Sequence, residues 1–453
     1  MYKLVLAIRY LVKRRISYFA VFAAALCVFV SFTVITVLSG LMSEFKMDAY
    51  RGIGDCVVSS KSLVGFAYYE DFVDRLRGSN FVEGVSPVIR SPAVVKANRE
   101  GGETDSEGYV LEIMGIDPVS HSRVTAFGQW LFHHKGNVGE AFDSVYEPNM
   151  PGCVPGVRFL FKQASDGSYE IDERRSRVGL EVSVLPLTAK GAPAKAGTGE
   201  INTKSFYYSD HVDSESGYFD WHRLFLPFEE AQVLCGMGTG IKRANALFVK
   251  FKPGIRLGAG CAKVRRFWQD FVESKVGASQ ANTLEGVRVQ DWKTYSRYII
   301  AIVETQQTFM MVIFAMIGII TVFIAFVVFY MIICHKSKDV GILRSIGFSR
   351  ADVLSLFLGF AVLIGIVGSA IGAVCGWWYL LHIEEIEVWM FEHFEFRLFR
   401  GACNLADVPS AINPTVLGAT MLAAIGACIL GAFLPSWQAA KKEPVETLQV
   451  SQL

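Results

Sequence analysis

Four long apolar runs divide the chain, and none of them contains a charged side chain. They cover residues 16–43, 305–334, 353–381 and 408–440. Each run exceeds the roughly 20 residues that a helix needs to cross a bilayer. A buried helix of a soluble protein normally keeps polar positions on one face, and these runs have no such face. The pattern therefore predicts four transmembrane helices, in keeping with a chain that is 52% hydrophobic.

The short segments beside these runs differ in charge, which predicts the orientation of the chain. Basic residues gather before the first run, between the second and third, and after the fourth: Lys3, Arg9, Lys13, Arg14, Arg15, Lys336, Lys338, Arg344, Arg350, Lys441 and Lys442. The segment between the third and fourth runs is acidic instead, with Glu384, Glu385 and Glu387 among its residues. The positive-inside rule then places both termini and residues 335–352 in the cytoplasm. Residues 45–304 are expected outside the membrane.

The N-terminal residues before the first span are predicted to form a helix with one apolar and one basic face. Leu4, Ile8 and Leu11 share the apolar face, and Lys3 and Arg9 lie opposite. Such a helix can lie in the membrane interface. A cleaved signal peptide is the alternative for the first run, but the run is longer than a signal h-region and no A-x-A-like site follows it. We therefore expect a retained anchor.

The region outside the membrane alternates between strand-like and helical patterns. Short β-rich runs occur at 55–60, 84–97, 109–116, 179–187 and 245–252, and helical patterns occur at 68–78, 227–237 and 261–277. This mixture is typical of an α+β fold. The predicted fold class is thus an α-helical membrane domain with four transmembrane helices plus a large α+β extracytoplasmic domain inserted between helices 1 and 2.

The predicted organisation follows the chain in eight parts. Residues 1–44 form the N-terminal amphipathic helix and first span, 45–304 the extracytoplasmic domain, 305–334 the second span, 335–352 a cytoplasmic coupling helix, 353–381 the third span, 382–414 a short extracytoplasmic loop, 415–436 the fourth span, and 437–453 a cytoplasmic tail.

Several kinds of chemistry are not indicated by the sequence. Lys+Arg 44 against Asp+Glu 43 gives no sign of a nucleic-acid partner. No phosphate loop, G-x-S-x-G or H-E-x-x-H motif occurs, so no catalytic site and no cofactor are expected in this chain. The nine cysteines form no C-x-x-C pair, although one disulfide remains open.

Two histidine-containing segments are weak candidates for a metal site. The first is the stretch HVDSESGYFDWH, with His211, Asp213, Asp220 and His222, whose spacing matches no ligand pattern. The second is His133–His134, whose adjacent side chains are expected to point apart. We expect both to be polar surface segments, and no metal is assigned.

Glycines recur along the third run at helical spacing: Gly365, Gly368, Gly372 and Gly376. Small residues on one face allow two transmembrane helices to approach closely. The partner of this face is either another helix of the same chain or a second subunit, and the spacing favours neither. The spans contain almost no ionisable groups, which argues against a hydrophilic conduction path.

The segment HKSKDVGILRSIGFSRADV, residues 335–353, has more internal order than a simple connector needs. Residues 336–346 have helical character, and Gly347 suits the left-handed residue that ends a helix. Ser349 followed by Asp352 predicts a capping box at the start of the third span. We therefore expect a short helix held rigidly at the cytoplasmic face. The alternative is a solvated basic loop at the lipid headgroups.

This segment and others resemble a known family. KSKDVGILRSIGFSRADVLSLF is similar to the cytoplasmic coupling segment of permease subunits in the FtsX/MacB/LolC–LolE group of ABC transporters. GAFLPSWQAAKKEPVETL, residues 431–448, resembles the closing motif of that family. YVLEIMGIDP and GYFDWHRLFLPFEEAQVL resemble external-domain segments of its LolC/LolE and MacB branches. The order of one span, a large external domain and three spans also agrees.

The resemblance implies a role for particular residues. It assigns Asp339, Val340, Gly341, Leu343, Arg344 and Gly347 to contact with an ATPase, and Pro435, Ala439, Ala440, Pro444 and Leu448 to the tail motif. It implies cytoplasmic ABC ATPase subunits, which carry ATP and Mg²⁺, and a second permease copy or sister permease. Membrane lipids and a lipoprotein or other amphiphilic substrate are further expected partners, with an extracytoplasmic acceptor or adaptor.

Three functions follow from the resemblance and one from the residues alone. The first is release of lipoproteins from the inner membrane by a multi-pass subunit that is not itself an enzyme. The alternatives are efflux through a MacB-like adaptor complex and FtsX-like regulation of a cell-wall hydrolase. A membrane-anchored enzyme that uses residues 211–222 belongs to a different class. Residues 152–187 follow the family pattern poorly, so the resemblance does not carry a substrate specificity.

Overall fold

The chain divides into two compact units, each of which is described by itself. The computed structural model describes residues 15–98, 108–144, 150–163, 169–170, 179–193, 201–214, 221–238, 240–335, 345, 347–394 and 413–441. The first unit, called the helical unit below, comprises Met1–Met42, Ile302–Trp389 and Asp407–Leu453. The second, called the sheet unit, comprises Ser43–Ala301 and Met390–Ala406.

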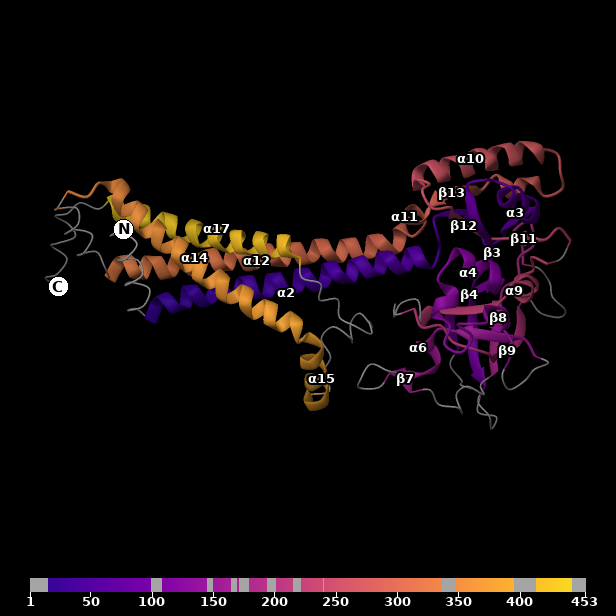
Figure 1. Cartoon of the computed structure of the whole chain (residues 1–453), viewed down its shortest axis with the longest axis horizontal. Helices are drawn as coiled ribbons and strands as arrows, with labels where there is room; N and C mark the ends of the chain where they lie inside the picture. Colours follow the sequence, from indigo (N-terminus) through magenta and orange to yellow (C-terminus); the bar gives the residue numbers. More distant parts are fainter. Residues whose placement is uncertain are drawn as a thin grey trace. The chain divides into compact units, whose positions relative to one another are not determined.

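Four long helices carry the apolar runs of the sequence (Figure 1). They are α2 (Arg15–Arg51), α12 (Arg297–His335), α14 (Arg350–Leu381) and α17 (Pro414–Lys441). All four are long and apolar enough to cross a membrane. The fourth span was predicted at residues 415–436, and α17 covers these residues and extends to Lys441. The proposed N-terminal amphipathic helix lies outside the described residues.

The helical unit has a core built from small residues and a few aromatic rings. Ala24, Phe329, Ala361 and Ala432, one from each long helix, are all buried in the same cluster. Large apolar side chains lie on the outside instead; Phe323, for example, is 66% exposed. This distribution matches the composition of transmembrane helix contacts, where small residues let backbones approach.

The sheet unit is built on a nine-stranded sheet in the order β13-β1-β12-β3-β4-β10-β5-β9-β8. In that order, the strands are Val287–Asp291, Cys56–Ser60, Ala246–Phe251, Val82–Asn98, Tyr109–Ile116, Arg223–Pro227, Gly152–Pro155, Asn202–Tyr208 and Gly179–Val184. Two small ribbons join β2 (Phe66–Ala67) to β11 (Arg243–Ala244) and β6 (Lys162–Gln163) to β7 (Tyr169–Glu170). The β4–β10 and β5–β9 pairs are parallel, and the other pairs are antiparallel.

The long strand β3 closes part of this sheet on itself. Its first half pairs with β12, and its second half pairs with β8, which also pairs with β9. The strands β3, β4, β10, β5, β9 and β8 therefore form a closed ring, and closure removes exposed edges. Alternate residues of β8, Leu180, Val182 and Val184, are buried, as the alternating pattern of a strand requires.

Helices cover the sheet and complete two hydrophobic clusters. On one side, α3 (Tyr69–Arg77) and α10 (Leu257–Ser274) bring Phe72, Trp268 and Phe271 together. The Phe72 ring lies 4.8 Å from the Trp268 ring and 5.1 Å from the Phe271 ring. A second cluster contains Phe127 and residues of α4 (Pro118–Val124) and α5 (Phe127–Trp130).

The remaining short helices cap strands or connect them. They are α6 (Val157–Leu160), α9 (Phe228–Leu234), α11 (Trp292–Tyr295), and the 3-10 turns η1 (Val138–Glu140) and η2 (Ala281–Leu284). The helices expected at 68–78, 227–237 and 261–277 are present as α3, α9 and α10. Each strand-like run named above likewise contains a strand.

One helix lies in a region that was expected to be only a loop. Helix α15 spans Ile383–Phe394 within the 382–414 segment. Ile383 and Glu387 are buried and Trp389 is 54% exposed, so the buried positions of this helix do not follow an apolar stripe in the sequence. Seven cysteines are free thiols: Cys27, Cys56, Cys153, Cys235, Cys261, Cys375 and Cys428.

Candidate functional site

The end of the 335–353 segment is well defined where α14 begins. Gly347 has a φ of 107°, a left-handed conformation that side chains rarely adopt. The Asp352 N–H donates to Ser349 Oγ at 3.2 Å, and the Ser349 N–H donates to Asp352 Oδ2 at 3.2 Å. The predicted capping box is therefore confirmed. The proposed ATPase contacts Asp339, Val340, Gly341, Leu343 and Arg344 lie outside the described residues.

Part of the tail motif lies in the last turns of α17. Pro435, Ala439 and Ala440 are all buried in the helical unit. Ala439 and Ala440 belong to the same cluster as Phe329 of α12 and Phe357 of α14. The end of α17 is thus packed against the helices that flank the 335–353 segment. The other tail residues, Pro444 and Leu448, lie outside the described part.

The glycines of α14 contact two other helices of the chain. A Cβ atom added to Gly372 would lie 2.3 Å from the Ala25 carbonyl oxygen of α2. At Gly368 it would meet Ala24 at 2.7 Å, and at Gly376 it would meet Phe32 at 2.9 Å. Gly365 faces α17 instead, with Ile425 at 3.0 Å. Within the chain, the glycine face therefore allows α2 and α14 to approach more closely than any larger residue would permit.

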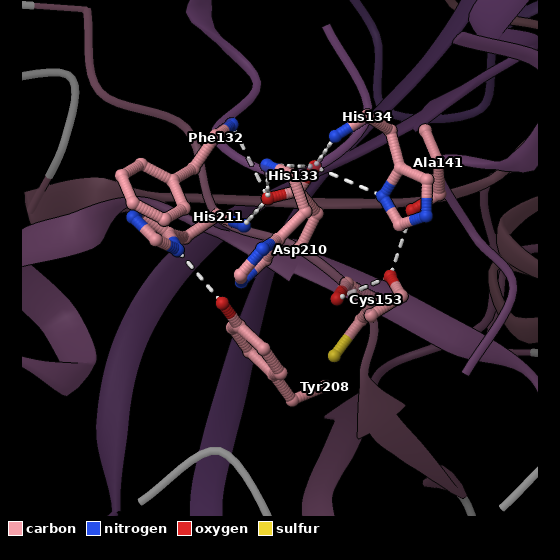
Figure 2. A network of polar contacts seen from close by, with 9 residues as sticks. Phe132, His133, His134, Ala141, Cys153, Tyr208, Asp210 and His211 are labelled. Atoms are coloured by element: carbon pink, nitrogen blue, oxygen red, sulfur yellow. Dashed lines mark hydrogen bonds and ion pairs between the residues drawn. The ribbon is translucent and has the colours of Figure 1, made fainter. Parts of the chain in front are cut away.

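A polar cluster in the sheet unit is centred on the Asp210 carboxylate, which is completely buried (Figure 2). Backbone N–H groups of three consecutive residues donate to it: Phe132 at 3.2 Å, His133 at 3.0 Å and His134 at 2.9 Å. The His211 N–H adds a fourth donor at 2.7 Å. The His134 Nδ1 atom also lies 3.1 Å from Asp210 Oδ2. Asp210 therefore joins two chain segments that are far apart in sequence.

The imidazole of His211 is held in a fixed position beside this carboxylate. Its Nδ1 atom forms a hydrogen bond of 2.7 Å with the Tyr208 hydroxyl, and its ring stacks on Phe132 at 4.7 Å. Burial lowers the pKa of His211 to about 4, although the Asp210 carboxylate opposes this shift and His133 adds to it. The ring is therefore neutral near pH 7.

Three groups of the cluster are of the types that hold metal ions. His133, Asp210 and His211 each offer one ligand atom, and these atoms all lie within 4.8 Å of one another. His133 is exposed, whereas the other two are buried. Among the described residues, this is the group that brings such atoms together, and it differs from the set predicted from residues 211–222.

The expectation for the two histidine-containing segments is wrong in one respect, because His211 is buried and not at the surface. His133 and His134 were expected to be surface residues; His133 is exposed, and the backbone N–H groups of both residues donate to Asp210. Of the 211–222 set, His211 belongs to the cluster, while Asp220 lies outside the described residues. Asp210 itself was missed because nothing local marks it. The strand β9 ends two residues earlier, and three donors to the Asp210 carboxylate (Phe132, His133 and His134) lie more than seventy residues away in the sequence.

Part of the helical unit matches a known sequence family. Residues 311–444 match the FtsX-like permease C-terminal family, a stretch that contains α14, α17, most of α12 and the whole 335–353 segment. The chain therefore contains an FtsX-like permease domain, which confirms the resemblance to the FtsX/MacB/LolC–LolE family. Together with four apolar helices, this domain indicates a multi-pass inner-membrane protein.

Curated proteins that are similar to part of this chain are named LolC, which is one branch of that family. The lipoprotein-releasing system transmembrane protein LolC of Neisseria meningitidis serogroup B (strain ATCC BAA-335 / MC58) is 24% identical over 166 residues, which is 36% of this chain and 40% of that protein. LolC of Xylella fastidiosa (strain Temecula1 / ATCC 700964) is 25% identical over 163 residues, with 36% and 39% covered. The matched segment thus spans about two fifths of the length of these relatives.

A solved structure gives a weak geometric match. The crystal structure of the periplasmic region of MacB from Actinobacillus actinomycetemcomitans is 13% identical, with a TM-score of 0.25. The match covers 55% of this chain and 95% of the MacB region.

Proposed function

We propose that this chain is the transmembrane subunit of an ABC transporter and that it passes the motion of cytoplasmic ATPase subunits to an extracytoplasmic domain. The observation that carries the proposal is the permease domain at residues 311–444, because it includes the 335–353 segment. The chain has no phosphate loop of its own, so ATP and Mg²⁺ belong to the partner subunits. A second permease copy or a sister permease completes the assembly.

The local structure around Gly347 supports a mechanical role for this segment. A capping box fixes the first turn of α14 directly after the left-handed Gly347. Each satisfied cap contributes roughly 1 kcal/mol to the stability of a helix end. A force that reaches Gly347 would therefore pass into α14 through the capped first turn of that helix. The basic side chains support a cytoplasmic position for this segment by the positive-inside rule, and with it an extracytoplasmic sheet unit.

Release of lipoproteins is the transport function that we propose for this subunit. The LolC relatives named above carry that function in their names. The apolar spans also favour a substrate that stays in or outside the membrane, because a polar solute would need ionisable groups along its path. Efflux through an adaptor and regulation of a hydrolase are the competing functions.

Charge reversal in the coupling segment tests the coupling proposal. The Arg344→Glu chain, purified with the ATPase subunit that accompanies it, is expected to lose at least tenfold in substrate-dependent ATP hydrolysis. Arg350→Glu is the matched control, because Arg350 begins α14 in the same segment and is expected to retain the wild-type rate. Equal rates for the Arg344→Glu and wild-type complexes would contradict the assigned contact.

A separate experiment tests the substrate. Cells depleted of this protein are expected to accumulate lipoproteins in the inner-membrane fraction, measured by membrane fractionation and palmitate labelling. Normal sorting of lipoproteins would reject the release function while leaving the ATPase coupling intact. Co-purification of an adaptor would then favour efflux, and co-purification of a cell-wall hydrolase would favour regulation.

A further inference from the structure

Two of the long helices, α2 and α12, each have one end in the sheet unit. Helix α2 ends at Arg51, and α12 begins at Arg297, directly after the short helix α11. Both ends belong to residues 43–301, so the contacts between them are internal to the sheet unit. The ring of Tyr50, in the last turn of α2, lies 5.5 Å from the ring of Trp292, the first residue of α11. The last turn of α2 therefore packs against the helix that leads into α12.

The residue Asp55 joins these two helix ends to the sheet. Its Oδ1 atom accepts a hydrogen bond from the Tyr50 hydroxyl at 3.2 Å, and its Oδ2 atom accepts one from the Phe251 N–H at 2.7 Å. Its carbonyl oxygen accepts a hydrogen bond from the Trp292 N–H at 3.2 Å. The Tyr50 hydroxyl also accepts a hydrogen bond from Lys250 Nζ at 2.7 Å. Asp55 thus contacts α2, α11 and β12 at once.

A second set of contacts runs from α11 across three strands of the closed ring. The hydroxyl of Tyr295, the last residue of α11, accepts a hydrogen bond from Arg90 Nη1, and the guanidinium carbon of Arg90 lies 5.4 Å from the centre of the Tyr295 ring. Arg90 Nε donates to Glu112 Oε1 at 2.8 Å. The other carboxylate oxygen of Glu112 lies 3.8 Å from Arg223 Nε. These four residues, called the Glu112 bridge below, connect α11 to β3, β4 and β10.

The negative charge of Glu112 holds the bridge together. Burial would raise the pKa of Glu112, but Arg90 and Arg223 lower it below its usual value, so the carboxylate is ionised near pH 7. Hydrogen bonds between charged groups are stronger than those between neutral ones. The far end of the bridge lies beside the residue that follows α2, because a Cβ atom added to Gly52 would lie 3.6 Å from Arg223 Nη1. The bridge therefore runs from α11 to the end of α2.

We propose that the Glu112 bridge is the connection through which movement of α2 and α12 reaches the closed strand ring, with Glu112 as its positioning residue. Under the proposed function, on which this inference rests, ATPase motion reaches the extracytoplasmic domain. Coupling between distant sites is carried by packed and hydrogen-bonded groups that connect rigid elements. Three of the strands in the ring carry the bridge, so displacement of a helix end acts on several ring strands together.

The test compares two charge-neutral variants in the purified complex of the full chain with its ATPase subunit. Glu112→Gln removes the charge between Arg90 and Arg223 at nearly constant volume. Glu230→Gln is the matched control, because Glu230 pairs with Lys204 in the same unit and its side chain is 34% exposed, against 32% for Glu112. Hydrogen exchange of the backbone amides in β4 and β10 is measured by mass spectrometry, once with ADP and once with ATP plus vanadate.

The wild-type complex and Glu230→Gln are expected to show the same difference in exchange between the two nucleotide states. In Glu112→Gln this difference should shrink about threefold or more, while ATP hydrolysis by the partner continues and the melting temperature matches that of Glu230→Gln. Tyr295→Phe is a milder second variant, since it removes one hydroxyl and keeps the ring beneath Arg90, and it should shrink the difference about twofold.

Three results would overturn the proposal, and they separate it from the proposed function. A wild-type difference that both Glu112→Gln and Tyr295→Phe retain would reject the bridge and leave the proposed function intact. Equal losses in Glu112→Gln and Glu230→Gln would also reject the bridge, since any ion pair of the sheet unit would then have the same effect. A wild-type complex with no difference between the nucleotide states would reject the proposed function and the bridge with it.

Discussion

The helical unit and the sheet unit use apolar residues in opposite ways. In the sheet unit, large rings such as Phe72 are fully buried in the core. In the helical unit, Phe323 of α12 and Leu422 of α17 are 66% and 71% exposed, and Gly372 and Ala24 occupy the contacts between helices. The sheet unit buries its aromatic rings because exposing them to water is unfavourable. The helical unit pairs its backbone N–H and C=O groups within helices because unpaired backbone polar groups are unfavourable in lipid.

This contrast shows why the two units hold together by different means. Removal of apolar surface from water stabilises the sheet unit, so its free energy of unfolding depends on the size of the side chains in its core. Lipid is as apolar as the helix surfaces, so transmembrane helices gain little from burial and rely on close packing. The three predictions below test this distinction, beginning with the largest effect.

The largest effect is expected from truncation of a core ring. Phe72→Ala removes the ring that contacts Trp268 and Phe271, and we expect it to lower the free energy of unfolding of the sheet unit by about 3–5 kcal/mol. Phe323→Ala in α12 is the control and should change stability by less than about 0.5 kcal/mol. Urea unfolding in detergent, followed by tryptophan fluorescence, measures both. A comparable loss at Phe323 would mean that its exposed face is a packed interface.

The second effect comes from enlargement of a residue between helices. Gly372→Leu forces side-chain atoms against the Ala25 backbone and Val28, and we expect a cost of about 1–3 kcal/mol. Gly359 lies on the same helix with nothing within 4 Å of its position, so Gly359→Leu should be tolerated. The monodisperse fraction after heating, measured by size-exclusion chromatography, reports the difference. Equal behaviour of the two variants would show that α2 does not restrict α14.

The smallest effect is a pH dependence confined to the sheet unit. Burial, with a further contribution from Arg223, lowers the pKa of His121 to about 3, and Asp117 opposes this shift. A histidine in the unfolded chain titrates near pH 6.5. The contribution of His121 to the free energy of unfolding is therefore fully present above that pH and is lost as the pH falls toward 3. The loss is about 1.4 kcal/mol per pH unit in this window.

A substitution at this position isolates the contribution of one histidine. His121→Gln removes the titrating group and retains a polar partner for Ser86, whose Oγ lies 3.0 Å from His121 Nδ1. The difference in unfolding free energy between pH 7 and pH 5 should then shrink by about 2 kcal/mol relative to wild type. An unchanged difference would assign the acid sensitivity to other groups. The contacts of Gly372 contain no titratable side chain, so packing there should not respond to pH.

Much of the local structure could be predicted because short-range rules decide it. Strand β4 covers the residues 109–116 that the sequence pattern indicated, and the capping box at Ser349 and Asp352 has the expected bonds. Helix α15 was not predicted, because residues 383–394 mix glutamates with apolar residues and its buried positions include Glu387. The residues assigned to the ATPase contact stay a prediction, since Arg344 and its neighbours lie outside the described part.

The sequence by itself determined the four apolar helices, the main strands and the start of α14, because hydrophobic period, bilayer thickness and capping act within a few residues. Only the tertiary structure decided which distant groups meet. It brings Asp210 to the backbone of His133, places α2 against Gly372, and buries Arg243 where it donates to the carbonyl oxygens of Val64, Leu187 and Gly236. The physical reason is that a buried polar group must form hydrogen bonds with whichever groups the fold brings near it. The spacing of residues along the sequence does not show which groups those are.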